Sequence, residues 1–370
     1  LGYMSLLRLP VQTAKNPLNT ELLLPMPRPW VLAVYSAPNF SGIPAYRWSI
    51  PFTEMQRRGY KMDFGHASMI PGWEASGANL HAYDAFVVHH VLYDQEFMDR
   101  IHAAGKRLIG DMDDDYSDKT RDVNDDETLE KLWAQVRRMD AMTVSTPEVK
   151  KLIVDYADFP EDRVFVCPNL MDLTIWRNWE RAPELTIGLS GGDSHKNDWK
   201  VVPGAVSRIL EERSDVHFFL AGLTPDYLTD LKYKFPSRVH IHAAWIPYTE
   251  YPGLVAKMDI GLCPVDPCDP FNFKKSPIKA LELMCSGGVA VCSDMDVYRS
   301  VVTHGENGFL VEHSEEGFYQ GIKMAIEERE RVVSNGFAYV AENWDVRKRY
   351  GEWRSAYEQI VQLPIRNYIS

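Results

Sequence analysis

The 370-residue sequence lacks the marks of several protein classes. Its five cysteines form no C-x-x-C pair and have no histidines at zinc spacing, which argues against a structural zinc site. No apolar run approaches the roughly 18 residues that a membrane span needs, and the start shows no clean signal-peptide pattern. Basic charge is also scarce, since the formal net charge is −12, and this disfavours a whole-molecule grip on nucleic acid. We expect a cytoplasmic protein with reduced thiols.

Short apolar runs alternate with stretches of helical spacing along the whole chain. The predicted strands lie at 30–35, 85–88, 107–109, 141–144, 164–167, 185–189, 216–220, 239–241, 260–264, 289–292 and 309–311. The predicted helices lie at 46–58, 94–104, 128–138, 147–156, 201–212, 226–233, 251–257, 316–331 and 347–362. This alternation predicts an α/β protein with parallel sheets covered on both faces.

The length and the alternation predict two domains with a cleft between them. We predict an N-terminal arm at 1–29, a first Rossmann-like domain at 30–178 and a second at 179–345. A helix in residues 346–370 is expected to pack back toward the first domain. Two facing, doubly wound domains place a cleft at the carboxyl ends of their strands, where such sheets bind ligands.

A loop with two lysines precedes a predicted helix in residues 269–294. Ser276 is expected to cap this helix and Pro277 to occupy its first position. Backbone N–H groups and the positive end of the helix dipole point out of the helix start, where Lys274 and Lys275 add charge. The pattern is typical of a phosphate site. The alternative is an ordinary capped helix with a solvated lysine face.

A second candidate phosphate loop follows the first strand of the second domain. There Gly191 and Gly192 lead into a polar loop that contains Lys196. Glycines let backbone amides approach a phosphate, and a lysine balances its charge, although glycine pairs also occur in simple tight turns. Because βα units of a doubly wound domain converge on one sheet edge, we expect this loop and the helix after Lys275 to bind one diphosphate from two sides.

From residue 164 onward the chain resembles family 4 glycosyltransferases (glycosyl transferases group 1), which have the GT-B fold. The resemblance rests on these segments in this order: VFVCPNLMDLTIW, SGGDSHKND, VHFFLAG, AAWIPYTEYPGLVAKMDIGLCPV, PFNFKKSPIKALELMCSGGVAVCSD and VYRSVVTHGENGFLVE. It implies two facing Rossmann-like domains, an acceptor domain and then a nucleotide-sugar domain. It also implies no metal and no cofactor other than a nucleotide-sugar donor as co-substrate.

The resemblance assigns roles in the second domain. Glu282 corresponds to the family's second conserved glutamate, which is expected to bind the ribose hydroxyls, and Trp245 has the position that packs near the nucleobase. Eight residues before Glu282 the family usually has another glutamate, and here Lys274 stands in its place. Asp269 is the candidate to substitute for that glutamate, and the alternative is that Lys274 or Lys275 faces the diphosphate, as in relatives with a Lys-Ser-x-x-Lys pattern. Asp269, Asn272 and Lys274 are therefore the candidates for contacts to the donor sugar. A core aromatic is the alternative for the tryptophan.

Candidates in the first domain come from three segments. His89 ends a buried strand, and the resemblance assigns it to the donor sugar; a structural hydrogen bonder is the alternative. Gly42 and Arg47 belong to the loop that closes over the sugar and diphosphate in family members, and they are predicted to lie on the acceptor side of the cleft. Asp113 and Asp114 are expected to line the acceptor side. A divalent cation held by this acidic cluster is a competing interpretation, disfavoured because the diphosphate belongs on the other domain.

The resulting hypothesis is a retaining, metal-independent transferase that moves a sugar, hexosyl or related, from a nucleotide donor to a hydroxyl acceptor. Catalysis would rest on stabilising the departing diphosphate with Gly192 amides, Lys196 and Lys275, while His89 contacts the sugar. The alternatives are a nucleotide-sugar epimerase of the same fold and a non-catalytic nucleotide-sugar-binding module. The acceptor could be a glycan, a lipid-linked sugar or a hydroxylated DNA base, the last disfavoured by the acidic charge.

Overall fold

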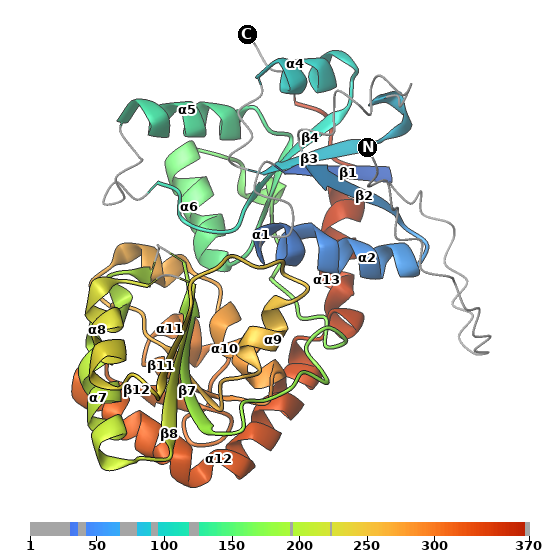
Figure 1. The fold of residues 1–370 in the computed structure, drawn as a ribbon. Helices are drawn as coiled ribbons and strands as arrows, with labels where there is room; N and C mark the ends of the chain where they lie inside the picture. The colour runs from blue at the N-terminus through green and yellow to red at the C-terminus, as the bar shows by residue number, and fades with distance from the viewer. Residues whose placement is uncertain are drawn as a thin grey trace, which may run out of the picture.

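The computed structural model describes residues 30–35, 42–66, 80–89, 95–117, 126–192, 195–222 and 224–366. The predicted arm at 1–29 lies outside these ranges. The described residues form two six-stranded sheets, one in each domain, and every strand pair is parallel. Figure 1 shows the two domains stacked one above the other. The predicted α/β class with two parallel sheets is confirmed.

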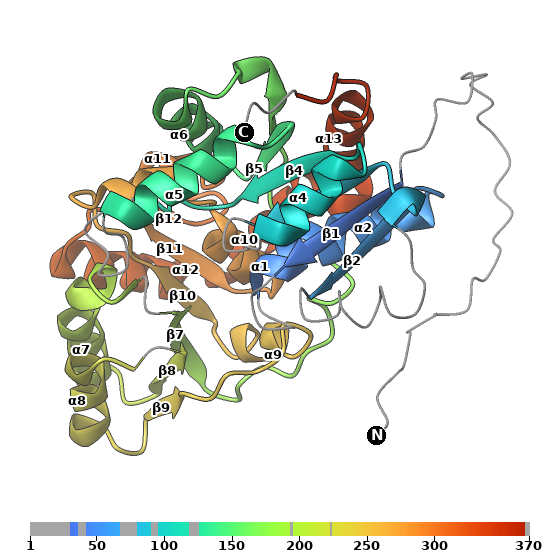
Figure 2. The ribbon, with the colours of Figure 1, turned by 90° about the horizontal axis from the view of Figure 1, so that it is seen from above.

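The first sheet has the strand order β2-β1-β3-β4-β5-β6. Its strands are β1 (Trp30–Tyr35), β2 (Lys61–His66), β3 (Ala85–His89), β4 (Arg107–Met112), β5 (Ala141–Val144) and β6 (Val164–Val166). Its helices are α1 (Gly42–Pro44), α2 (Ile50–Arg57), α4 (Gln95–Ala103), α5 (Asp126–Arg137) and α6 (Pro147–Ala157), with a π-helical turn at Ala45–Ser49. Helices α4 and α5 lie on the side of the sheet away from the second domain (Figure 1, Figure 2).

The second sheet has the order β12-β11-β10-β7-β8-β9. Its strands are β7 (Leu185–Gly191), β8 (Val216–Gly222), β9 (Val239–His242), β10 (Ile260–Cys263), β11 (Val289–Ser293) and β12 (Phe309–Val311). The helices of this half are α7 (Val202–Glu212), α8 (Asp226–Lys234), α9 (Tyr251–Val255), α10 (Ile278–Cys285), α11 (Asp296–Arg299), α12 (Glu315–Asn343) and α13 (Val346–Ile360).

The predicted start of α10 is wrong by one residue. The cap position belongs to Pro277, and Ser276 makes no capping hydrogen bond. Pro277 has a ψ of 25°, outside the helical region, and its carbonyl accepts the first helical bond, from Ala280 N at 3.1 Å. The residues before it are also more ordered than a loop, since Pro270–Lys274 form a 3-10 helix that the Asp269 side chain caps. The two lysines thus stand at the end of one short helix and just before the next.

The last helix crosses back to the first domain. Helix α12 runs along the second domain, and α13 continues from it to lie beside α2 (Figure 1). There Phe52 packs edge-on against Trp353 and Tyr357, with ring centroids 6.3 and 5.5 Å apart. The Trp353 indole donates to the Pro168 carbonyl at 3.0 Å. The end of the chain is therefore anchored on the first domain and on the crossover, the segment 167–184 that connects the two sheets.

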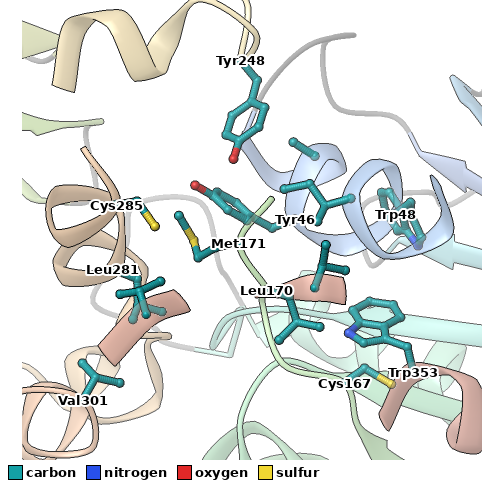
Figure 3. Packing of buried hydrophobic residues seen from close by; sticks show 14 of the residues in the cluster. Tyr46, Trp48, Cys167, Leu170, Met171, Tyr248, Leu281, Cys285, Val301 and Trp353 are labelled. Carbon is teal, nitrogen blue, oxygen red and sulfur yellow. The ribbon is translucent and has the colours of Figure 1, made fainter. Parts of the chain in front are cut away.

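A buried apolar cluster joins the two domains below the cleft. Figure 3 shows it around Tyr46, Leu170, Met171, Leu281 and Trp353, which come from both domains and the crossover between them. Burying apolar surface between domains stabilises their relative placement. The five cysteines are free thiols, and all except Cys268 are buried. Across the described part of the chain, no helix is long and apolar enough to cross a membrane.

Candidate functional site

A cleft of about 760 Å³ opens between the domains at the carboxyl ends of their strands. Both domains line it. The first domain and the crossover contribute Gly42, Ile43, Tyr46, Asp113 and Asn169, and the second contributes Gly191, Gly192, Ala221, Gly222, Ala243, Ala244, Trp245, Ile246, Tyr248, Tyr251, Leu254, Ile278, Lys279 and Glu282. Six residues predicted from sequence are among them, namely Gly42, Asp113, Gly191, Gly192, Trp245 and Glu282.

Glycines end two neighbouring strands of the second sheet, β7 and β8. Gly191 of β7 pairs with Gly222 of β8. A Cβ atom on Gly222, which has a φ of +96°, would lie 2.3 Å from the Gly191 carbonyl oxygen, so only glycine permits this approach. A Cβ atom on Gly192 would instead meet no heavy atom within 4 Å. The backbone after β7 is therefore open to the cleft, as a loop that holds an anion through its amides requires.

Glu282 lies on the cleft wall as a buried carboxylate with protein partners on both oxygens. Tyr46 donates to Oε1 at 2.7 Å, whereas Tyr251 and Lys279 donate to Oε2, each at 3.0 Å. Burial opposes the charge of Lys279, but Glu282 outweighs it and holds the pKa of this ammonium above its ordinary value. The pair presents a fixed negative group and a fixed positive group to the cleft.

Tyr46, Tyr248 and Tyr251 are site residues that the sequence interpretation did not include, and Lys279 was placed on the helix face but given no role. Lys279 had a local signal, because it precedes Glu282 by three residues and so lies on the same helix face. Tyr46 had none, since it belongs to the other domain and is 236 residues away from its partner. Burial, followed by the charge of Glu282, raises the pKa of Tyr46. Its hydroxyl therefore keeps its proton and acts as a donor.

Lys275 and Asn272 belong to a buried cluster beside the cleft, which they do not line. Asp198 is its centre: Lys275 Nζ lies 3.3 Å from its Oδ2, and Asn272 donates to its Oδ1 at 2.7 Å. His195 Nδ1 also lies 3.1 Å from Asp198. Burial and then Lys275 lower the pKa of His195 to about 4, whereas the pKa of Asp198 is about 2 because the His195 hydrogen bond and Lys275 outweigh its burial. The sugar contact of Asn272 and the phosphate role of Lys275 stay predictions.

Other predicted residues of the second domain lie outside the cleft lining. Lys196 is exposed, and its carbonyl accepts a hydrogen bond from Tyr227. Asp269 accepts from Phe271 N at 3.0 Å, which is a local capping role. Ser276 and Pro277 precede α10, and of that helix it is Ile278, Lys279 and Glu282 that line the cleft.

Arg47, predicted on the acceptor side, does not line the cleft. Its guanidinium is fully buried and forms a two-point ion pair with Asp111, at 2.8 and 3.0 Å. It also donates to the Cys167 carbonyl and to Asn169 Oδ1, and it stacks over the Trp353 ring. A charge removed from water needs such partners, and here they lie in β4, in the crossover and in α13. Arg47 therefore ties the first domain to the interdomain connection.

The acidic loop after β4 directs its carboxylates to different protein partners. Asp113 lines the cleft and accepts from Tyr116 at 2.7 Å, and His89 Nε2 lies 3.2 Å from the same oxygen. Asp115 pairs with Lys274 of the second domain at 2.6 Å. Asp114 is outside the cleft lining. Within the described ranges, no group of three or more potential ligands is placed to hold a metal ion. His89 is buried beside Asp113, and its contact to a sugar stays a prediction.

The two facing parallel sheets and the cleft between them define the GT-B fold, which solved structures confirm. The chain matches HepE from Anabaena in complex with UDP-glucose with a TM-score of 0.64 and 14% identity, over 89% of this chain and 100% of that one. Sucrose-phosphate synthase from Thermosynechococcus elongatus matches at 0.66 and 12%, over 90% and 99%. A UDP-N-acetylglucosamine 2-epimerase, described as putative, from Listeria monocytogenes matches at 0.59 and 9%, over 92% and 100%.

Residues 185–328, which make up most of the second domain, match the family described as Glycosyl transferases group 1. This match confirms the resemblance to group 1 glycosyltransferases that the sequence segments indicated. None of the curated protein sequences compared with the chain matches it.

Proposed function

We propose that this protein is a glycosyltransferase that moves a sugar from a nucleotide-sugar donor to a hydroxyl acceptor with retention of anomeric configuration. The observation that carries the proposal is the placement of Glu282 and Lys279 on the cleft wall that also contains the glycine ends of β7 and β8. A carboxylate can accept hydrogen bonds from ribose hydroxyls, and open backbone amides with a cation can hold a diphosphate. One nucleotide sugar would satisfy both groups.

The donor is proposed to lie across the second domain with its sugar toward the first. The diphosphate then occupies the wall at Gly191 and Gly192, and the ribose lies at Glu282. Trp245, whose side chain is 60% exposed at the cleft, offers a face on which a nucleobase can stack. UDP and UDP-glucose are the ligands named for HepE, so UDP is the first nucleotide to test.

Catalysis is proposed to depend on stabilising the diphosphate as it leaves, as fixed donors and cations do. The Gly192 amide and Lys279, which both line the cleft, are the groups nearest to this role. Lys196, exposed on the following loop, and Lys275, beside Asp198, are retained as further candidates from the family resemblance. A glycan, a lipid-linked sugar or a hydroxylated DNA base can supply the acceptor hydroxyl.

A thermal-shift screen with UDP, GDP, ADP and their sugars tests donor binding, because a ligand that binds only the folded state raises Tm. We expect one nucleotide family to raise Tm in the natural protein and to have little effect on Glu282→Ala. Glu250→Ala, an exposed glutamate of the same domain, is the matched control and should respond like the natural protein. An equal response of the two variants would remove Glu282 from the site.

Product analysis with the donor found in this way separates the remaining functions. We expect transfer to one class in a panel of glycan, lipid-linked and hydroxylated-DNA acceptors, with an anomeric NMR signal that matches the donor. An inverted product would contradict retention. Conversion of donor without acceptor would identify an epimerase, and binding without turnover in any mixture would identify a binding module.

A further inference from the structure

The carboxylate of Glu282 is almost fully occupied by side chains of the protein itself. A carboxylate offers about four acceptor positions, and among the described residues three donors reach this one: Tyr46, Tyr251 and Lys279. About one position is therefore open for a ligand. The two vicinal hydroxyls of a ribose need two, so bidentate binding requires that one protein donor leaves.

Tyr46 is the donor that can leave at the lowest cost. Tyr251 and Lys279 hold each other, because Lys279 Nζ donates to the Tyr251 hydroxyl at 2.8 Å, and Tyr251 also lies 3.1 Å from Ser190 Oγ. Both belong to the same domain as Glu282. Tyr46 comes from the first domain, through the π-helical turn Ala45–Ser49, and its bond to Glu282 crosses the cleft.

A second hydroxyl group is placed to receive Tyr46 when it leaves. Tyr248 lines the cleft and is 7% exposed, and within the described part of the chain its buried hydroxyl makes no hydrogen bond of good geometry. Tyr46 and the Trp176 indole are the side chains placed to donate to it. The rings of Tyr46 and Tyr248 pack edge-on with centroids 5.1 Å apart, and Figure 3 shows the two side chains turned toward each other. An unsatisfied buried hydroxyl costs free energy, which a bond from Tyr46 would recover.

We propose that Tyr46 competes with one ribose hydroxyl of the nucleotide for Glu282, and that nucleotide binding transfers the Tyr46 hydroxyl from Glu282 to Tyr248. The proposal rests on the function proposed above, with the ribose at Glu282. Tyr46 is then a positioning residue that sets how strongly the site depends on both ribose hydroxyls. Tyr46 keeps its one hydrogen bond in the exchange: a ribose hydroxyl takes its place at Glu282, and its own hydroxyl donates to Tyr248.

Two conservative substitutions should change nucleotide affinity in opposite directions. Tyr46→Phe removes the competing hydroxyl and should tighten UDP binding about 3- to 10-fold, because the bond that Tyr46 gives up at the charged Glu282 is stronger than the bond that it gains at the neutral Tyr248. Tyr248→Phe removes the acceptor for the displaced hydroxyl and should weaken UDP binding by a similar factor. Titration calorimetry gives both dissociation constants, and thermal unfolding confirms that each variant folds. GDP or ADP replaces UDP if the thermal-shift screen ranks it first.

Deoxyribose analogues supply a readout that a merely structural role would not change. The 2′-deoxy and 3′-deoxy forms of UDP carry one hydroxyl, which fits the one open position on Glu282, so their Kd should change less than about 2-fold in Tyr46→Phe. Unchanged or weaker UDP binding by Tyr46→Phe would overturn the inference, as would an equal gain for UDP and both analogues. If the natural protein binds none of UDP, GDP and ADP, the proposed function fails first and the inference with it.

Discussion

Lys274 Nζ of the second domain lies 2.6 Å from Asp115 Oδ2 of the first domain. The Thr146 hydroxyl of the first domain also donates to the Lys274 carbonyl, at 3.1 Å. The position at which the family resemblance leads us to expect a glutamate facing the donor sugar thus holds a cation that bridges the two domains. A contact between Lys274 and the sugar would compete with this ion pair.

The interdomain ion pair should show a measurable coupling energy. Asp115 is 4% exposed, so its carboxylate loses a compensating charge that water cannot replace. In a double-mutant cycle with Lys274→Met and Asp115→Asn, we expect a coupling of about 1–3 kcal/mol in the free energy of unfolding, measured by urea titration. The exposed pair Lys131–Glu127 is the control, with about 0.5 kcal/mol or less. Equal coupling energies in the two cycles would show that the Lys274–Asp115 pair stabilises the folded protein no more than an exposed ion pair does.

Two glycine substitutions should separate folding from binding. Gly222→Ala places a Cβ atom against the Gly191 carbonyl at a positive φ and should lower stability by about 1–3 kcal/mol. Gly192→Ala meets no protein atom, so stability should be unchanged. Its methyl group enters the wall at which we place the diphosphate, and UDP binding should weaken about tenfold, or about 1.4 kcal/mol. Thermal unfolding and calorimetry measure the two effects. If Gly192→Ala bound UDP as tightly as the natural protein does, the diphosphate would have to bind at another part of the cleft.

Stability should depend on pH through His195. Its folded-state pKa of about 4 is below the ordinary value near 6.5, so the unfolded chain binds a proton that the folded chain does not. The contribution is complete above about pH 6.5 and is lost as the pH falls toward 4, by about 3 kcal/mol at most. His195→Gln should therefore lose less stability than the natural protein between pH 7 and 4.5, in urea titrations at each pH. The same slope for both proteins would contradict the shifted pKa.

The fold was largely predictable because its central strands are continuous apolar runs. Every residue of β3 (Ala85–His89) and β11 (Val289–Ser293) is buried, so local composition was a sufficient signal. Strand β2 (Lys61–His66) was missed because only Met62 is buried among polar neighbours at the sheet edge. The start of α10 was misplaced because the pattern Ser-Pro fits a capped helix equally well one residue earlier.

The site was predictable where it depends on local patterns and not where it depends on distant contacts. Gly191 and Gly192 could be predicted from their position at the end of a strand, and Glu282 from its position on a helix face. Arg47 was assigned to the acceptor side from the family resemblance, and nothing nearby in the sequence reveals its partner Asp111, 64 residues away. Tyr46 was overlooked for the same reason. A contact between residues far apart in the chain produces no periodic pattern, so it cannot be predicted from one sequence.

Tyr46 and Arg47 are consecutive residues of the π-helical turn Ala45–Ser49, and their side chains serve different parts of the molecule. Tyr46 reaches Glu282 across the cleft, whereas Arg47 binds the Cys167 carbonyl and Asn169 in the crossover. A rotation of one domain relative to the other about this crossover displaces the same turn that carries the Tyr46 hydroxyl. Under the function proposed above, the occupancy of the ribose position and the angle between the domains are therefore coupled variables.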